Sequence, residues 1–188
     1  MNYYEINANS FIENTLKLDL SELYEKFLKS VPEKSTILDV GCGPGRDLKY
    51  FKSLGHTLIG LEPCEELAQF ARNYSMCEVV KCQVQDYSPK GKFNAIWACA
   101  SLLHLSTKDL VNSLNHFSTI LEKRGILYCS FKYGEFEGER GGRFFNDQTL
   151  ESFTKLLPGE LEIFENWITK DVRPQRDEKW LNILIKNL

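Results

Sequence analysis

The chain has 188 residues, of which 43% are hydrophobic and 26% are charged. This length and composition suit one folded domain, spanning residues 1–188, with a core of its own. A net charge of -3 and the lack of long basic runs argue against general nucleic-acid binding, although a local basic patch is left open. The longest uncharged stretch, residues 93–107, is shorter than the roughly 20 apolar residues of a membrane-spanning helix.

The N-terminus and the cysteines both predict a cytoplasmic protein. The N-terminus lacks the basic and apolar regions of a signal peptide. The six cysteines form no C-x-x-C pair, so we expect reduced, structural thiols and no metal site. These cysteines are Cys42, Cys64, Cys77, Cys82, Cys99 and Cys129.

Helical and strand patterns alternate along most of the chain. We expect helices over residues 21–28, 45–54, 63–73, 107–121 and 149–157, and strands over 36–40, 56–62, 79–80, 93–100, 126–133, 161–169 and 180–186. This alternation predicts an α/β three-layer sandwich, in which helices cover both faces of a mostly parallel sheet. The last two strands, joined by the polar turn 170–179, predict a C-terminal antiparallel hairpin.

The helix expected over 107–121 has the clearest end signals. Ser106 is a favoured N-cap residue. Lys123-Arg124-Gly125 predicts a helix end with terminal cations and a capping glycine.

The first strand runs into a glycine-rich turn, Gly41-Cys42-Gly43-Pro44-Gly45. A strand, a glycine turn and the start of a helix form a motif that holds the backbone close to a nucleotide-like ligand. The dinucleotide pattern G-x-G-x-x-G places a glycine where Arg46 stands and an apolar residue where Asp39 stands. A carboxylate at position 39 repels a pyrophosphate and favours a ligand with a positive charge, such as an ammonium or a sulfonium.

The arrangement resembles motif I, acidic-h-G-x-G-x-G, of the class I S-adenosylmethionine-dependent methyltransferases. The resemblance implies that Gly41, Gly43 and Gly45 pack against the methionine half of S-adenosylmethionine, while Asp39 supports the site near its amino group. It also implies the seven-stranded fold of that family. The neighbouring residues that the resemblance assigns to the cofactor site are Cys42, Arg46, Pro63, Gln85 and Ala100.

Two further carboxylates follow predicted strands. Glu62 comes at the end of the second strand, where a carboxylate can accept hydrogen bonds from a ribose diol. Dinucleotide-binding proteins share this feature, so Glu62 alone does not choose between the two families. Asp86 matches the acid that methyltransferases often use to accept from the adenine amino group. A solvated surface acid is the commoner fate of any single carboxylate, but three at successive strand ends favour a nucleoside site.

The segment after the fourth strand offers one candidate for chemistry, His104. An [Asn/Asp]-Pro-Pro-aromatic motif and a metal-binding carboxylate are both missing there, which argues against base methylation by that route and against a magnesium-dependent catecholase. His104 resembles the L-x-H turn of small-molecule methyltransferases and is a candidate general base or orienting group. The alternative is a histidine that packs at the helix entrance.

Two segments are expected to cover the site. The glycine-rich run 134–145 is either a substrate lid or a mobile surface loop, and its Arg143 suits an anionic or planar substrate. Residues 1–30 are expected to form a helical cover over the cofactor, with Tyr3, Tyr4 and Phe11.

The leading hypothesis is therefore an enzyme that transfers a methyl group from S-adenosylmethionine, leaving S-adenosylhomocysteine, by in-line displacement at the sulfonium. A small-molecule acceptor is favoured, and the Gly45-Arg46-Asp47 extension resembles the tellurite-resistance and thiopurine-type branch. The alternatives are methyl transfer to RNA or protein, a non-catalytic module that binds the cofactor, and an NAD-dependent dehydrogenase. We expect a monomer or homodimer without a membrane partner.

Overall fold

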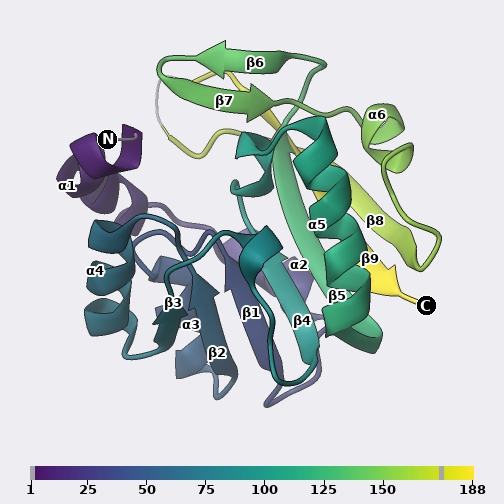
Figure 1. Cartoon of the computed structure of the whole chain (residues 1–188), viewed down its shortest axis with the longest axis horizontal. Helices are drawn as coiled ribbons and strands as arrows, with labels where there is room; N and C mark the ends of the chain where they lie inside the picture. The colour runs from purple at the N-terminus through teal and green to yellow at the C-terminus, as the bar shows by residue number, and fades with distance from the viewer. Residues whose placement is uncertain (1–2, 174–175) are drawn as a thin grey trace.

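The computed structural model describes residues 3–173 and 176–188. At its centre lies a seven-stranded sheet, whose strands are in order β3 (Glu78–Val80), β2 (Thr57–Leu61), β1 (Thr36–Val40), β4 (Phe93–Ala98), β5 (Leu121–Lys132), β9 (Lys179–Asn187) and β8 (Leu161–Lys170). Strands β1 to β5 pair in parallel, while β9 is antiparallel to both of its neighbours. The predicted α/β fold with a C-terminal antiparallel hairpin is confirmed (Figure 1).

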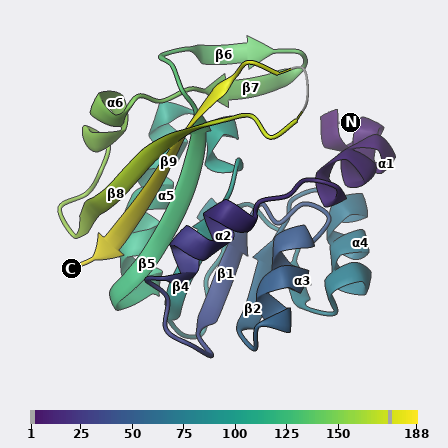
Figure 2. The same ribbon diagram turned by 180° about the vertical axis from the view of Figure 1, so that it is seen from behind.

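Helices cover both faces of this sheet. They are α1 (Tyr3–Leu16), α2 (Ser21–Leu28), α3 (Arg46–Ser53), α4 (Glu65–Ser75), α5 (Thr107–Ile120) and α6 (Leu150–Thr154), with short 3-10 turns η1 (Val84–Asp86) and η2 (Leu102–His104). Figure 1 shows α5 in front of the sheet, and Figure 2 shows α2 and α3 on the opposite face. The three layers predicted from the alternating pattern are therefore present.

Successive side chains of the central strands enter two different cores. In β1, Ile37 joins a core with Phe27 of α2 and Phe51 of α3, whereas Leu38 joins a core with Leu114 of α5. Because strands bury both faces, they read as continuous apolar runs in the sequence, which is why they were recognisable there. This packing leaves the carboxyl ends of β1, β2 and β4 together at one edge of the sheet.

The start of α5 agrees with the sequence and its end does not. The Ser106 hydroxyl accepts from the backbone amide of Asp109, so the predicted N-cap is confirmed. The helix ends at Ile120, because Leu121 is extended and pairs with Phe93 of β4. Gly125 therefore lies inside β5 rather than capping the helix, and the predicted cap was wrong. The left-handed residue at this bend is Arg124, with φ of 64°.

The glycine-rich run 134–145 is largely an ordered hairpin, of β6 (Glu137–Arg140) and β7 (Arg143–Asn146). The hairpin lies at the top of Figure 1, apart from the main sheet, and α1 lies at the side. The segment thus contains a two-stranded hairpin rather than an irregular loop. In the described part of the chain, no helix has the length and apolar character needed to cross a membrane.

Candidate functional site

The glycine turn after β1 is held against the end of β2. The amides of Gly41 and Cys42 both donate to the carbonyl of Leu61, at 2.8 and 3.0 Å. Gly41 has φ of 70°, and a Cβ placed on it would lie 2.5 Å from the Cβ of Ser101. Only glycine combines this backbone conformation with so close an approach to the segment after β4. The turn is thus wedged between two strand ends, with no room for a side chain at position 41.

Glu62, immediately after β2, clamps the turn from the other side. Its Oε2 accepts from the Gly43 amide at 3.0 Å, and its Oε1 accepts from the Cys64 amide at 2.9 Å. The side chain is buried, and this burial raises the pKa of Glu62 even though both amides oppose the rise. Each carboxylate oxygen keeps a second lone pair for another donor.

A cavity of about 490 Å³ opens beside Glu62, and we call it the Glu62 cavity. In its wall, Gln85 Oε1 and Ser101 Oγ are buried without a hydrogen-bond partner in the described part of the chain, and so is Asp39 Oδ2 behind the turn, although Asp39 lines neither cavity. Burial raises the pKa of Asp39 well above its usual range, and the nearby charge of Asp47 adds to this. Buried acceptors without donors are costly, so this cavity is suited to a ligand rich in hydrogen-bond donors.

Arg46 and Asp47 form a buried pair at the start of α3. Asp47 accepts from Arg46 at 2.6 Å, from the Trp97 indole at 2.8 Å and from the Tyr24 hydroxyl. Burial raises the pKa of Asp47, but the charge and hydrogen bonds of Arg46 outweigh that and leave it lowered. Arg46 also donates to the Thr15 carbonyl at 3.2 Å, which attaches the end of α1 to the turn. The guanidinium is therefore committed to protein partners.

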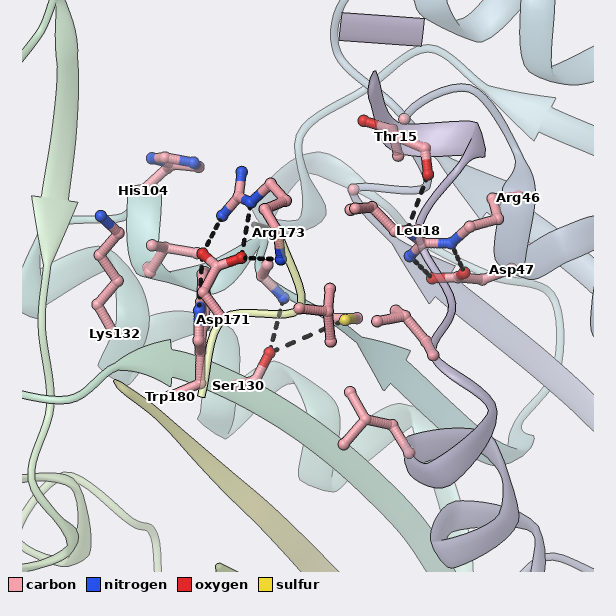
Figure 3. Close-up of a pocket in the computed structure, with 18 of the residues that line it drawn as sticks. Thr15, Leu18, Arg46, Asp47, His104, Ser130, Lys132, Asp171, Arg173 and Trp180 are labelled. Carbon is pink, nitrogen blue, oxygen red and sulfur yellow. Dashed lines mark hydrogen bonds and ion pairs between the residues drawn. The ribbon is translucent and has the colours of Figure 1, made fainter. Parts of the chain in front are cut away.

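A second cavity of about 190 Å³ adjoins the first, and we call it the Arg143 cavity. Tyr4, Gly41, Ala100 and His104 line both cavities. Figure 3 shows the side chains around the second one, with Lys132, Asp171 and Arg173 on one side and Arg46 and Asp47 on the other. Arg173 pairs with Asp171, and Lys132 pairs with Glu178 at 2.8 Å.

His104 is built into the wall that the two cavities share. Its Nδ1 lies 2.7 Å from the carbonyl of Phe144, which accepts only, so Nδ1 carries the proton. The other nitrogen, Nε2, then accepts from the Tyr4 hydroxyl at 2.9 Å. Burial lowers the pKa of His104 to about 4, and the charges of Arg143 and Lys132 add to the shift. His104 is thus a neutral imidazole that ties α1 to the β6–β7 hairpin.

Ala100, in the same wall, has an unusual backbone conformation. It has φ of 51°, in the left-handed region that non-glycine residues rarely adopt, and its amide donates to Ser130 Oγ at 2.9 Å. Such conformations persist where the surrounding structure imposes them, often at functional sites.

Most of the predicted site residues line one or both cavities, and three of them line neither. Gly41, Gly43 and Ala100 line both cavities; Glu62, Pro63 and Gln85 line the Glu62 cavity; Cys42, Arg46 and Arg143 line the Arg143 cavity. Asp39 is buried behind the turn, while Gly45 packs against Ala71 of α4 and Asp86 is exposed outside both cavities. Gln85, rather than Asp86, presents its side chain to the cavity.

Sequence reasoning missed Lys132, Asp171, Arg173 and Trp180, which line the Arg143 cavity. For Asp171 and Arg173 the only signal was that the polar turn 170–179 follows a strand, which is common for any exposed turn, and Lys132 and Trp180 were predicted only as strand residues. No group of His, Cys, Asp or Glu side chains in the described residues is arranged to hold a metal ion.

Residues 37–125 match the family model of the methyltransferase domain. This segment contains the glycine turn, Glu62, Gln85 and His104, which is the set that forms the Glu62 cavity and its shared wall. Over this segment the chain is similar to methyltransferase domains, and its seven-stranded sheet has the fold of the class I S-adenosylmethionine-dependent methyltransferases. Arg143 and the β8–β9 end of the chain lie beyond the matched segment.

Individual relatives are more distant. The chain is 32% identical over 117 residues to YqeM of Bacillus subtilis (strain 168), a candidate methyltransferase, covering 56% of this chain and 47% of YqeM. It is 33% identical over 146 residues to "Probable tRNA methyltransferase 9B" of Mus musculus, covering 76% of this chain and 31% of that protein. The chain thus spans less than half the length of these curated relatives.

A solved structure with a similar fold is the 1,6-didemethyltoxoflavin-N1-methyltransferase of Burkholderia thailandensis, with S-adenosylhomocysteine bound. The TM-score is 0.72 at 19% identity, and the match covers 89% of this chain and 76% of that one. A methyltransferase of Methanosarcina mazei gives a TM-score of 0.76 at 16% identity, covering 91% and 99% of the two chains. At these identities the likeness establishes the fold.

Proposed function

We propose that this protein binds S-adenosylmethionine in the Glu62 cavity and transfers its methyl group to a small-molecule acceptor in the Arg143 cavity. The observation that supports this most is that two buried oxygens in the wall of the first cavity, Gln85 Oε1 and Ser101 Oγ, have no hydrogen-bond partner among the described residues. S-adenosylmethionine brings an ammonium, two ribose hydroxyls and an adenine amino group, all of which donate hydrogen bonds. The residues present therefore fit this cofactor.

Each residue has a separate part in this proposal. Asp39 and Glu62 supply carboxyl oxygens, whose ionised forms a bound cation would favour against the effect of burial, and Gln85 supplies an amide oxygen. When bound, S-adenosylmethionine supplies a methyl group already activated on a positively charged sulfur. The protein's main contributions are then positioning and the exclusion of water, for which α1 and the β6–β7 hairpin (residues 134–145 as the lid) are placed.

The shared wall offers one route for a proton leaving the acceptor. The proton would pass to the Tyr4 oxygen as the Tyr4 proton moves to His104 Nε2, along the 2.9 Å hydrogen bond between them. Because the pKa of His104 is lowered to about 4, this route is a weak base. His104 accordingly acts in this proposal mainly as a positioning residue for Tyr4.

Calorimetric titration of the full chain with S-adenosylmethionine and S-adenosylhomocysteine tests the cofactor assignment. We expect dissociation constants on the order of micromolar and at least tenfold weaker binding of NAD. Gln85→Ala is expected to weaken binding about fivefold, whereas Asp86→Ala, its exposed neighbour, leaves it unchanged. Tighter binding of NAD, or no binding of either methyl cofactor at millimolar concentration, would overturn the proposal.

Transfer RNA is the second candidate acceptor, because a relative that is 33% identical over 76% of this chain is named "Probable tRNA methyltransferase 9B". A screen with methyl-labelled cofactor over small metabolites, transfer RNA and proteins separates the two. Label in a metabolite supports the proposed acceptor class, label in transfer RNA replaces it, and tight cofactor binding without any transfer indicates a binding module. A cytoplasmic location is part of the same proposal, and the six unpaired cysteines support it.

A further inference from the structure

The Arg143 cavity holds more positive than negative charge. Its walls contain the guanidinium groups of Arg46, Arg143, Arg173 and Arg176 and the amino groups of Lys132 and Lys170, but only two carboxylates, Asp47 and Asp171. The Glu62 cavity has the opposite balance, with Glu62 and Asp109 and no lysine or arginine among its described lining residues. The whole chain has a net charge of -3, so the excess of cations is local to this cavity.

Among the cations of this cavity that are at least partly buried, Arg143 is the one for which the described residues offer no carboxylate partner, whereas Lys170 and Arg176 are exposed. Arg46 is paired with Asp47, Arg173 with Asp171, and Lys132 with Glu178. For Arg143, no carboxylate of the described residues lies within ion-pair distance, and its buried Nε has no hydrogen-bond partner there. A partly buried guanidinium without an anion is costly, and a bound oxyanion would offset that cost.

The surroundings of Arg143 hold its guanidinium in place. It lies over the ring of Tyr3, at 4.5 Å from the ring centre, and over Phe145 at 5.1 Å. Burial raises the pKa of Tyr4, and the neighbouring Arg143 opposes that rise. A guanidinium stacked between rings keeps its planar fork oriented, which suits two-point recognition of a carboxylate or phosphate.

The cavity also lacks a strong base. Asp47 and Asp171 are neutralised by arginines, and both nitrogens of His104 are engaged by Tyr4 and Phe144. An acceptor that must lose a proton would therefore meet no strong general base among these residues. An acceptor that is already negatively charged needs no base to remove a proton.

We propose that the methyl acceptor is a small oxyanion, carrying a carboxylate or phosphate group, and that Arg143 is the residue that pairs with this group. The inference rests on the proposed function, because it names the substrate class of the same site. The shared chemistry is a planar or tetrahedral group with adjacent oxygens, which the guanidinium fork of Arg143 can bind at two points.

The test measures binding to the full chain saturated with S-adenosylhomocysteine, in low-salt buffer, by calorimetry. The probes are benzoate and indole-3-acetate for the carboxylate, phenyl phosphate for the phosphate, and benzamide and indole-3-acetamide as neutral counterparts. We expect at least one oxyanion to bind ten times more tightly than its neutral counterpart. The tighter of the carboxylate and phosphate arms identifies the group.

Variants assign the preference to one residue. Arg143→Gln should bring the ratio of acid to amide affinity close to one, and Arg143→Lys should restore part of it. Arg124→Gln changes the net charge equally at an exposed position outside the cavity, so it should keep the wild-type ratio. S-adenosylhomocysteine affinity should stay within twofold in all three. A ratio that Arg143→Gln leaves intact would overturn the assignment.

The wild-type comparison needs no variant and can overturn the inference alone. Equal binding of acids and amides, no oxyanion binding at millimolar concentration, or methyl transfer to transfer RNA only would each do so. The titration with S-adenosylhomocysteine is read first. If it binds and the oxyanions show no preference, this inference fails while the cofactor assignment stands; if it does not bind, the proposed function fails.

Discussion

The two cavities on either side of the glycine turn differ in charge and in what their buried polar atoms lack. Among the described residues, the unpartnered buried atoms in the wall of the Glu62 cavity are oxygens of Gln85 and Ser101, whereas in the Arg143 cavity the unpartnered atom is a guanidinium nitrogen of Arg143. One cavity therefore lacks donors and the other lacks acceptors. A cationic cofactor and an anionic acceptor satisfy both, and their opposite charges bring them together across the shared wall.

The cavities also differ in how the chain builds them. The Glu62 cavity draws mainly on residues that directly follow β1, β2, β3 and β4, with α1 and Phe144 of β7 added. The Arg143 cavity gathers side chains from α1, the end of β5, the β6–β7 hairpin and the β8–β9 turn. The first is the common part of a parallel α/β fold, where ligands bind beyond the strand ends. The second is assembled largely from a terminal helix, a hairpin and a turn, and binding specificity commonly lies in such segments on a rigid scaffold.

Gly41→Ala should damage both cavities and give the largest effect. The added Cβ would lie 2.5 Å from Ser101 Cβ on a backbone with φ of 70°, so the segment after β4 must shift. We expect S-adenosylhomocysteine affinity to fall about 100-fold, equivalent to roughly 3 kcal/mol, as measured by calorimetry. Gly55→Ala is the matched control, because Gly55 has φ of 90° with no atom within 4 Å of the new Cβ. Unchanged affinity in Gly41→Ala would show that the turn does not shape the cofactor site.

The sequence predicted more of the Glu62 cavity than of the Arg143 cavity. The sheet, the glycine turn and Glu62 were predictable because buried strands and tight turns leave local patterns in the chain. Gln85 and Asp86 of the 3-10 turn η1 were both predicted at the site, but of the two only Gln85 lines the Glu62 cavity, and strand-end position alone could not tell them apart. Tyr4 and His104 are 100 residues apart in sequence, and their contact depends on how α1 docks. The hydrophobic periodicity of the sequence cannot predict such a long-range contact.

The end of α5 shows the same limit on a smaller scale. Lys123-Arg124-Gly125 has the composition of a helix cap, yet Leu121 pairs with Phe93 and starts a strand. Strand pairing across 28 residues outweighed a local capping signal. Local signals of about 1 kcal/mol give way when a neighbouring strand offers a continuous ladder of hydrogen bonds.

His104, on the shared wall, should make stability depend on pH. The unfolded chain binds a proton near pH 6.5, whereas folded His104 does so only near pH 4, where its pKa lies. Its contribution is therefore complete above pH 6.5 and falls on acidification, by roughly 2 kcal/mol at pH 5. Urea unfolding at pH 7.5 and pH 5 measures this. His104→Gln, which can keep both hydrogen bonds, should lose that part of the pH dependence.

The difference between wild type and His104→Gln isolates this effect from two opposing groups. The pKa values of Asp39 and Glu62 are raised by burial, so those carboxyls favour the folded state as the pH falls. They are present in both proteins and cancel in the comparison. Parallel pH profiles for the two proteins would mean that folded His104 binds its proton like an exposed histidine.

Glu62→Gln should affect the Glu62 cavity alone. Glutamine keeps one oxygen to accept from the Gly43 or Cys64 amide but loses the charge and the second acceptor. We expect S-adenosylhomocysteine affinity to fall about tenfold, while oxyanion binding in the Arg143 cavity changes by less than twofold. Glu65→Gln, three residues along the chain and exposed, is the charge-matched control. Equal losses at both cavities would show that their charges are coupled rather than separate.

Tyr4→Phe should have the smallest effect and distinguish the shared wall from either cavity. The ring keeps its edge contact with Phe11, at 5.2 Å between centres, and only the hydroxyl that donates to His104 is lost. If Tyr4 positions the acceptor or passes on its proton, kcat falls about threefold to tenfold while cofactor affinity is unchanged. Tyr3→Phe, which keeps the ring under Arg143, should match wild type. A Tyr4→Phe protein with weaker cofactor binding and an unchanged kcat would instead assign this hydroxyl to the Glu62 cavity, because the loss would then lie in binding and not in the transfer step.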